Sequence, residues 1–325
     1  MSLMTATGAH AAEQIDLIID TDPGADDVVA LLFALASPQE LNIRALTTVA
    51  GNVRLDKTSR NARLAREWAG REEVPVYAGA EKPIMREPIY AENVHGVEGL
   101  SGVPIHEPKK GLADGNAIDY LIDTLMAAQP HSITIAMLGP QTNLALALIR
   151  EPGIVQGIKE VVIMGGAHFN GGNITPLAEF NLFADPQAAG VVLKSGVKLT
   201  YLSLDVTHKI LTSDARLGKI AALSNNASRL VVDILNDHIK TDMERYGIPG
   251  GPVHDATVIA YLLKPQLFSG RNVNVVVDVE EGPAFGQTIV DWGGGFKVPE
   301  SVFWVENGDA EGFFALLTER LARLK

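Results

Sequence analysis

The chain has 325 residues, of which 46% are hydrophobic and 20% are charged, and it contains no cysteine. This size suits one large α/β domain or two ordinary ones, and the lack of cysteine excludes disulfides, thiolate metal sites and a cysteine nucleophile. The formal net charge of -12, with no run of lysines or arginines, argues against a nucleic-acid surface or a patch for anionic membranes.

The N-terminal sequence MSLMTATGAHAAEQ has no basic region followed by a long apolar run, so it is not a convincing signal peptide. We therefore expect a cytoplasmic protein in which residues 1–14 form a tail. Because Met4 is a second methionine, residues 1–3 could be left over from cloning. No stretch of the sequence is long and apolar enough to predict a membrane-spanning helix.

Short apolar runs alternate with helical patterns along the first two thirds of the chain. The predicted strands are Ile15–Asp20, Ile43–Val49, Pro75–Ala78, Ile133–Leu138, Val161–Met164 and Lys198–Leu204. The predicted helices between them are Asp27–Ala36, Leu55–Trp68, Asn116–Ala128, Thr142–Arg150 and Pro186–Lys194. Apolar strands that alternate with helices are typical of a parallel sheet covered on both faces. We therefore expect an open, mostly parallel, Rossmann-like α/β sheet that binds its ligand at the carboxyl ends of its strands.

Two segments interrupt this alternation. Glu81–Gly115 is rich in glycine, proline and charge, and a loop of this length in a compact domain is usually functional or disordered. Tyr246–Val253 includes the run GIPGGPV and follows a long helical stretch that starts near Ala227. Such a hinged connection is typical of a lid.

The pattern becomes strand-like after Pro265 and predicts a small antiparallel extension at the C-terminus. Its predicted strands are Val273–Val279, Thr288–Asp291 and Val302–Val305, and the closing helix is Ala310–Leu324. No linker separates two domains, so we expect residues 15–325 to form one.

Four carboxylates crowd the turn after the first predicted strand, in the motif DTDPGADDVVA. Acidic side chains at a helix N-terminus are favoured as caps, which accounts for one or two of them. Capping does not account for Asp20, Asp22, Asp26 and Asp27 together, because their mutual repulsion must be offset. A hard divalent cation offsets it directly, and an all-oxygen ligand set favours Ca²⁺ or Mg²⁺ over Zn²⁺.

A histidine–aspartate pair, His254-Asp255, follows the hinged segment at the start of an apolar helix. One interpretation is a helix cap beside a surface histidine. The other is a general acid at His254 with Asp255 as a further metal ligand.

Further polar residues follow other predicted strands. Asn173 with Glu179 and Asn181 could bind a polyol or cap loops, and the turn after Leu138 could offer a backbone carbonyl to a cation. Gly51-Asn52 ends the second strand. His95-Gly96 lies in the long early loop, where a mobile, solvated histidine is one interpretation.

At these motifs the sequence resembles the inosine–uridine preferring nucleoside hydrolase family. DTDPGADDVVA matches the family signature throughout, and the resemblance extends from about Ile15 to the terminal helix. It includes TTVAGN, VHG, LGPQTN, MGG, AEFN and VHD, which begin at Thr47, Val94, Leu138, Met164, Ala178 and Val253.

The resemblance implies a calcium site and a hydrolytic centre. Asp22, Asp27 and Asp255 match the calcium-binding carboxylates, and the backbone carbonyl of Leu138 matches a further ligand. Asp22 would also be the general base, with Asn52 near the nucleophilic water. Hydrolysis of the N-glycosidic bond would then proceed by a metal-activated water through an oxocarbenium-like transition state.

The resemblance also implies which residues hold the ribonucleoside. Asp26 and Asn181 match the groups on the ribose 2′- and 3′-hydroxyls, and Asn173 and Glu179 match the clamp on the 5′-hydroxyl. His254 matches the position that protonates or orients the leaving base. Further substrate contacts are expected at His95, Met164 and Phe180.

Some relatives that hydrolyse inosine well carry tyrosines on the helix before the lid. Residues 234–243 contain none here, which slightly favours pyrimidine ribosides. By analogy with the family we expect a homodimer or homotetramer. Two other interpretations stay open on the sequence, namely a haloacid-dehalogenase-type Mg²⁺ phosphatase with Asp20 as nucleophile and a non-catalytic nucleoside- or sugar-binding protein.

Overall fold

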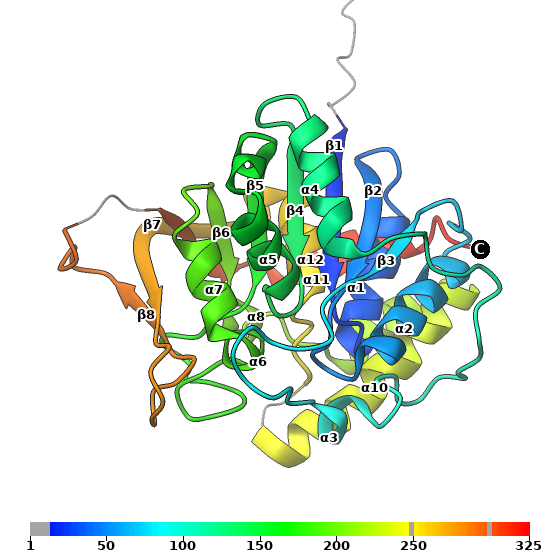
Figure 1. Cartoon of the computed structure of the whole chain (residues 1–325). Helices are drawn as coiled ribbons and strands as arrows, with labels where there is room; N and C mark the ends of the chain where they lie inside the picture. The colour runs from blue at the N-terminus through cyan, green and yellow to red at the C-terminus, as the bar shows by residue number, and fades with distance from the viewer. Residues whose placement is uncertain (1–13, 247–249, 298–300) are drawn as a thin grey trace, which may run out of the picture.

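Nine strands form one sheet within the residues that the computed structural model describes, 14–246, 250–297 and 301–325. The strands are β1 (Ile15–Thr21), β2 (Leu41–Thr48), β3 (Val76–Ala78), β4 (Ile133–Met137), β5 (Ile158–Met164), β6 (Leu199–Leu202), β7 (Phe268–Val277), β8 (Thr288–Asp291) and β9 (Val302–Gly308). Their order across the sheet is β3-β2-β1-β4-β5-β6-β9-β7-β8 (Figure 1).

The expected mostly parallel sheet is confirmed. Every neighbouring pair from β3 to β9 in that order is parallel, and only the β9–β7 and β7–β8 pairs are antiparallel. The last strand, β9, therefore inserts beside β6 as part of the parallel sheet. The C-terminal extension is antiparallel because β7 alone runs against the other strands.

Two helical layers cover the sheet. The helices are α1 (Ala25–Leu35), α2 (Leu55–Trp68), α3 (Glu92–His95), α4 (Ala117–Ala127), α5 (Thr142–Arg150), α6 (Phe180–Ala184), α7 (Pro186–Leu193), α8 (Leu204–Thr207), α9 (Asp214–Ala221), α10 (Asn226–Tyr246), α11 (Ala256–Leu263) and α12 (Ala310–Leu321). The predicted helices are present with slightly different ends, and α3, α6, α8 and α9 are short additions.

Side-chain alternation along the strands divides the core between these layers. In β1, Leu17 and Ile19 pack with residues of α1, α2, α10, α11 and α12 on one face. Ile18 between them packs with residues of α4, α5 and α7 on the other face, which lies toward the viewer in Figure 1. Burial on both faces explains why these strands are continuously apolar.

The carboxyl ends of the central strands meet at one edge of the sheet. Thr21 of β1 is paired with Thr48 of β2, and Asp20 is paired with Met137 of β4. The segments that follow β1, β2, β4 and β5 therefore emerge side by side, and they carry most of the predicted site residues.

The described parts of the two irregular segments form hydrogen bonds with the rest of the domain. In the first, Ile84 donates its backbone N–H to Asp185 at 3.0 Å, and Lys57 donates to the carbonyl of Val97 at 2.5 Å. In the second, residues 247–249 of the expected lid lie outside the described residues. Gly251 exchanges hydrogen bonds of 2.8–3.0 Å with Thr212. The described end of this segment is therefore fixed against the chain that follows α8. Among the described residues no helix has the length and apolar character needed to cross a membrane.

Candidate functional site

Asp22 lies fully buried between the segments that follow β1, β2 and β4. Its Oδ2 accepts the backbone N–H of Asn52 at 2.7 Å. A Cβ on Gly51 would stand 2.1 Å from Asp22 Oδ2, and a Cβ on Gly139 would stand 2.3 Å from Asp22 Oδ1. Both neighbours must therefore be glycine for the carboxylate to fit. Within the described residues, the buried Oδ1 of Asp22 has no hydrogen-bond partner.

Asp27 occupies the first turn of α1 and forms part of its cap. One carboxylate oxygen accepts from the Thr21 hydroxyl at 2.5 Å, and the other accepts from the Gly24 N–H at 3.0 Å. The Asn52 side-chain amide donates to the same Oδ2 at 3.0 Å. The capping interpretation is therefore correct for Asp27, and Asn52 links Asp27 to Asp22.

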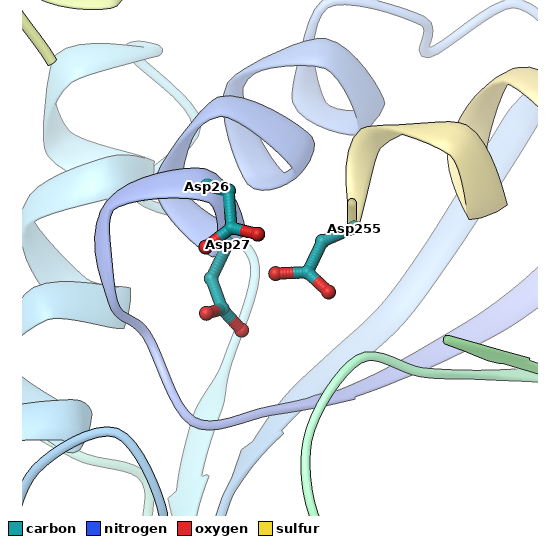
Figure 2. Close-up of side chains that lie close together, drawn as sticks. All are labelled: Asp26, Asp27 and Asp255. Atoms are coloured by element: carbon teal, nitrogen blue, oxygen red, sulfur yellow. The ribbon is translucent and has the colours of Figure 1, made fainter. Parts of the chain in front are cut away.

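Asp26, Asp27 and Asp255 converge although Asp255 is distant in sequence. Each offers a carboxylate oxygen, and these atoms lie within 4.8 Å of one another (Figure 2). All three side chains are buried. Asp255 precedes α11 but makes no side-chain capping hydrogen bond to that helix within the described residues, so a helix cap does not explain it.

The electrostatics of this cluster favour a cation. Burial, followed by the charge of Asp27, raises the pKa of Asp22 well above its usual value. Burial and then Asp26 raise the pKa of Asp27 to about 7, and burial with the charges of Asp26, Asp27 and Asp22 raises that of Asp255. Ionising several buried carboxylates together is unfavourable unless a positive charge offsets them. The unpartnered Oδ1 of Asp22 and the all-oxygen donor set therefore fit a hard divalent cation.

The predicted backbone ligand, the carbonyl of Leu138, lies at the end of β4. Asn181 donates its side-chain amide to this carbonyl at 2.7 Å and to the Met164 carbonyl at 3.3 Å. A carbonyl has two lone pairs, so the Leu138 oxygen keeps capacity for a cation. Because the Asn181 amide nitrogen donates in both bonds, the Oδ1 of this side chain is the atom that can accept a hydrogen bond from a ligand.

Glu179 and Asn173 are positioned by backbone groups. Glu179 accepts the N–H groups of Asn181, Gly166 and Leu182 at 2.9–3.2 Å, and burial raises its pKa to about 7. Asn173 accepts the N–H of Phe180 at 2.9 Å. Both side chains therefore cap the start of α6, as the loop-capping interpretation predicts, and both also line the cavity described below.

His95 is 6% exposed, so its interpretation as a solvated side chain is wrong. Its Nδ1 accepts the backbone N–H of Ala25 at 3.1 Å, which caps α1 from the loop that contains α3. A Cβ on Gly24 would stand 2.7 Å from this nitrogen, so the approach depends on glycine.

His254 is half-buried beside the C-terminal end of α8. Its Nδ1 lies 2.8 Å from the Thr207 hydroxyl, and its ring centroid lies 5.6 Å from that of His208. Burial lowers the pKa of His208, which favours a neutral ring.

All predicted site residues except Asp22 and Asp27 line one cavity, and those two lie buried next to it. The cavity brings together Asp26, Asn52, His95, Leu138, Met164, Asn173, Glu179, Phe180, Asn181, His254 and Asp255. Its lining also includes Asn93, Ile174, His208 and Pro252, which the sequence analysis missed. A histidine four residues after the predicted strand Lys198–Leu204 was the available signal for His208.

The family model for inosine-uridine preferring nucleoside hydrolase matches residues 17–315. The chain is 41% identical over 308 residues to the pyrimidine-specific ribonucleoside hydrolase RihB of Escherichia coli, covering 94% of this chain and 97% of that one.

Solved structures show the same architecture. A plant nucleoside hydrolase, PpNRh1, superposes with a TM-score of 0.89 and 31% identity, covering 95% of this chain and 99% of that one. A purine-preferring ribonucleoside hydrolase from Gardnerella vaginalis gives a TM-score of 0.87 and 29% identity, covering 94% and 98%.

Proposed function

This chain belongs to the inosine-uridine preferring nucleoside hydrolase family, and from that premise we propose that it is a Ca²⁺-dependent hydrolase of ribonucleosides, which it splits into ribose and free base. Membership makes it a hydrolase of N-glycosyl compounds and favours this function over the phosphatase and binding-protein interpretations. The observation that carries the proposal is the buried convergence of Asp26, Asp27 and Asp255, of which Asp26 and Asp255 line the cavity, next to the buried Asp22.

Asp22 is proposed as the general base. A bound Ca²⁺, held by Asp22, Asp27, Asp255 and the Leu138 carbonyl, would supply positive charge that lowers the pKa of a coordinated water. Asp22 Oδ1 has no competing hydrogen bond within the described residues, whereas Oδ2 is committed to Asn52. The protein therefore holds this carboxylate through Oδ2, and the two lone pairs of Oδ1 would serve the cation and the proton of the water.

The ribose is proposed to lie between Asp26 and the start of α6. Asp26 and Asn181 Oδ1 would accept from the 2′- and 3′-hydroxyls, and Asn173 and Glu179 would hold the 5′-hydroxyl. Each of Asn181 and Glu179 is already held by hydrogen bonds to the backbone. Such preorganised groups supply orientation, because they need not be ordered when the substrate binds.

The leaving base is proposed to face His254, with pyrimidine ribosides preferred. The preference rests on the absence of tyrosine from residues 234–243 and on the similarity to a relative named as pyrimidine-specific. Contacts from His95, Met164 and Phe180 would complete the substrate site. A cytoplasmic location, a homodimeric or homotetrameric assembly, and a single domain over residues 15–325 stay predictions.

The experiment that tests this function is a hydrolysis panel of uridine, cytidine, inosine, adenosine and guanosine, with and without a calcium chelator. We expect turnover of at least one riboside, fastest with uridine or cytidine, loss of activity with chelator, and recovery with added Ca²⁺. No turnover of any riboside would overturn the proposal, and unchanged turnover after complete chelation would remove calcium from it.

Calcium affinity is expected to rise between about pH 6 and pH 8, because metal ligands must be deprotonated. Asp27 has a pKa of about 7, and those of Asp22 and Asp255 are also raised, so protons occupy the metal-free cluster below that pH. Isothermal titration in two buffers of different ionisation enthalpy would measure the affinity and the protons released. Mg²⁺ is the control cation and should bind more weakly, because it demands octahedral geometry. Calcium affinity that is independent of pH would contradict the assignment of these ligands.

A further inference from the structure

We propose that Thr207 is a positioning residue that fixes the tautomer and orientation of His254, so that the neutral ring presents an Nε2–H to the leaving base. This inference rests on the proposed function. It concerns a short helix, α8, that the resemblance to the family did not bring into the site. The observation behind it is the 2.8 Å contact between the Thr207 hydroxyl and His254 Nδ1.

The direction of this hydrogen bond follows from the surroundings of the hydroxyl. Thr207 is fully buried, and within the described residues its hydroxyl has no acceptor other than His254 Nδ1. If Nδ1 carried the ring proton and donated it to Thr207, the hydroxyl proton would be left buried without an acceptor. Buried donors without partners are rare because they lose their bond to water. Thr207 therefore donates, Nδ1 accepts, and the neutral ring carries its proton on Nε2.

Both partners of the contact are held in place by other bonds. At the start of α8, Leu204 donates its N–H to the Gly166 carbonyl at 2.9 Å, and Thr207 donates its N–H to Ser203 at 3.1 Å. On the other side, Gly251 is bonded to Thr212, and Pro252 is bridged to Leu211. These bonds hold the backbone on both sides of the contact between the hydroxyl and the imidazole.

His208 limits the remaining freedom of the His254 ring. The two rings lie 5.6 Å apart at an interplanar angle of 53° and both line the cavity. His208 is a neutral neighbour, because burial lowers its pKa. The ring of His254 thus lies beside His208 and accepts a hydrogen bond from Thr207 at Nδ1, so the neutral ring carries its proton on Nε2.

The consequence concerns how the leaving base is stabilised. When the C1′–N bond breaks, its electron pair passes to the base, and negative charge develops there. A neutral Nε2–H stabilises that charge by donating a hydrogen bond without giving up its proton. The opposite tautomer would present a lone pair to the same charge and oppose departure.

The test compares Thr207→Val, which removes the hydroxyl, with Thr207→Ser, which keeps it. On uridine, Thr207→Val should lower kcat by about tenfold to 100-fold, the range typical of residues that orient a functional histidine. On p-nitrophenyl riboside, whose leaving group departs without assistance, the loss should be below about threefold. Thr207→Ser should restore most of the activity on uridine. Thr200→Val is the matched control, because Thr200 is a buried threonine in β6 whose hydroxyl has no hydrogen bond within the described residues.

A second measurement does not depend on activity. In the two-bond ¹H–¹⁵N correlation spectrum of the whole protein at a pH where His254 is neutral, its signals should show the Nε2–H tautomer in the wild type and a mixture in Thr207→Val. An Nδ1–H tautomer in the wild type would overturn the inference, even if the valine variant failed to fold. Equal losses of Thr207→Val on both substrates, or no loss on either, would also overturn it. A wild-type protein without activity on any riboside would instead contradict the proposed function.

Discussion

Asp22→Asn is expected to lower kcat on every riboside by about 10³-fold or more, because one substitution removes both a proposed metal ligand and the proposed general base. The asparagine side chain keeps the size of aspartate, so it fits between Gly51 and Gly139, where an added Cβ on either glycine would collide with the carboxylate. It can also still accept the Asn52 N–H. We therefore expect the fold to survive. Steady-state kinetics with saturating Ca²⁺ and the thermal midpoint of unfolding would measure both expectations.

Asp20→Asn is the matched control for this experiment. Asp20 is buried two residues away, and burial raises its pKa to about 7. Its Oδ2 accepts from the Thr47 hydroxyl at 2.5 Å and from the Asn143 amide at 2.8 Å, bonds that asparagine can keep. The fall in kcat of Asp20→Asn should stay at about tenfold, as for a residue that supports a functional side chain without touching the substrate. Near-full activity of Asp22→Asn, or equal losses in the two variants, would contradict the assignment of Asp22 as base.

Asp20 also shows how support for the site is built. Asn143, which bonds Asp20, donates to the Thr48 carbonyl at 3.0 Å and accepts the Ala80 N–H at 2.8 Å. A Cβ on Gly79 would stand 2.1 Å from Asn143 Oδ1. This network joins the ends of β1 and β2 to the start of α5. Asp20 therefore helps to hold together the strand ends next to Asp22. These bonds explain the buried Asp20 without a role as the nucleophile of a phosphatase.

The sheet and the acidic turn were predictable because their signals are local. Apolar runs that alternate with helical periods determine the strand–helix succession, and a carboxylate-rich turn after a strand can be recognised in the motif itself. The position of β9 beside β6 was not predictable in this way. It depends on the pairing of Leu199 with Val302, two residues far apart in the sequence, and no local pattern reports such a partner.

The parts of the site that the sequence did not reveal depend on contacts between distant segments. The helix α8 has four residues, too few for a helical period, and its Thr207 meets His254 across 47 residues. Gly51 and Gly139 stand in recognisable motifs, but the reason for glycine appears only when both meet Asp22. His95 looked solvated because its loop has no periodicity, whereas the fold buries it against α1.

His254→Ala is expected to separate substrates by the quality of their leaving groups. On uridine, kcat should fall by about 10²-fold to 10³-fold, since hydrogen-bond donation to a departing base is worth rate factors of this order. On p-nitrophenyl riboside the loss should be below about tenfold, because the nitrophenolate needs little stabilisation. Parallel kinetics on the two substrates, with KM reported separately from kcat, would measure the ratio.

The ratio of the losses on uridine and on p-nitrophenyl riboside also tests whether His254 acts on the leaving base and not on Ca²⁺ binding. Asp255 follows His254 directly and is a proposed metal ligand, so a disturbed backbone in His254→Ala would weaken Ca²⁺ binding as well. Calcium titration of the variant serves as the control and should give the wild-type affinity. If affinity is unchanged and both substrates lose activity equally, His254 does not act on the leaving group, and the cavity must hold that donor elsewhere. His208, which lines the same wall, would then be the residue to substitute next.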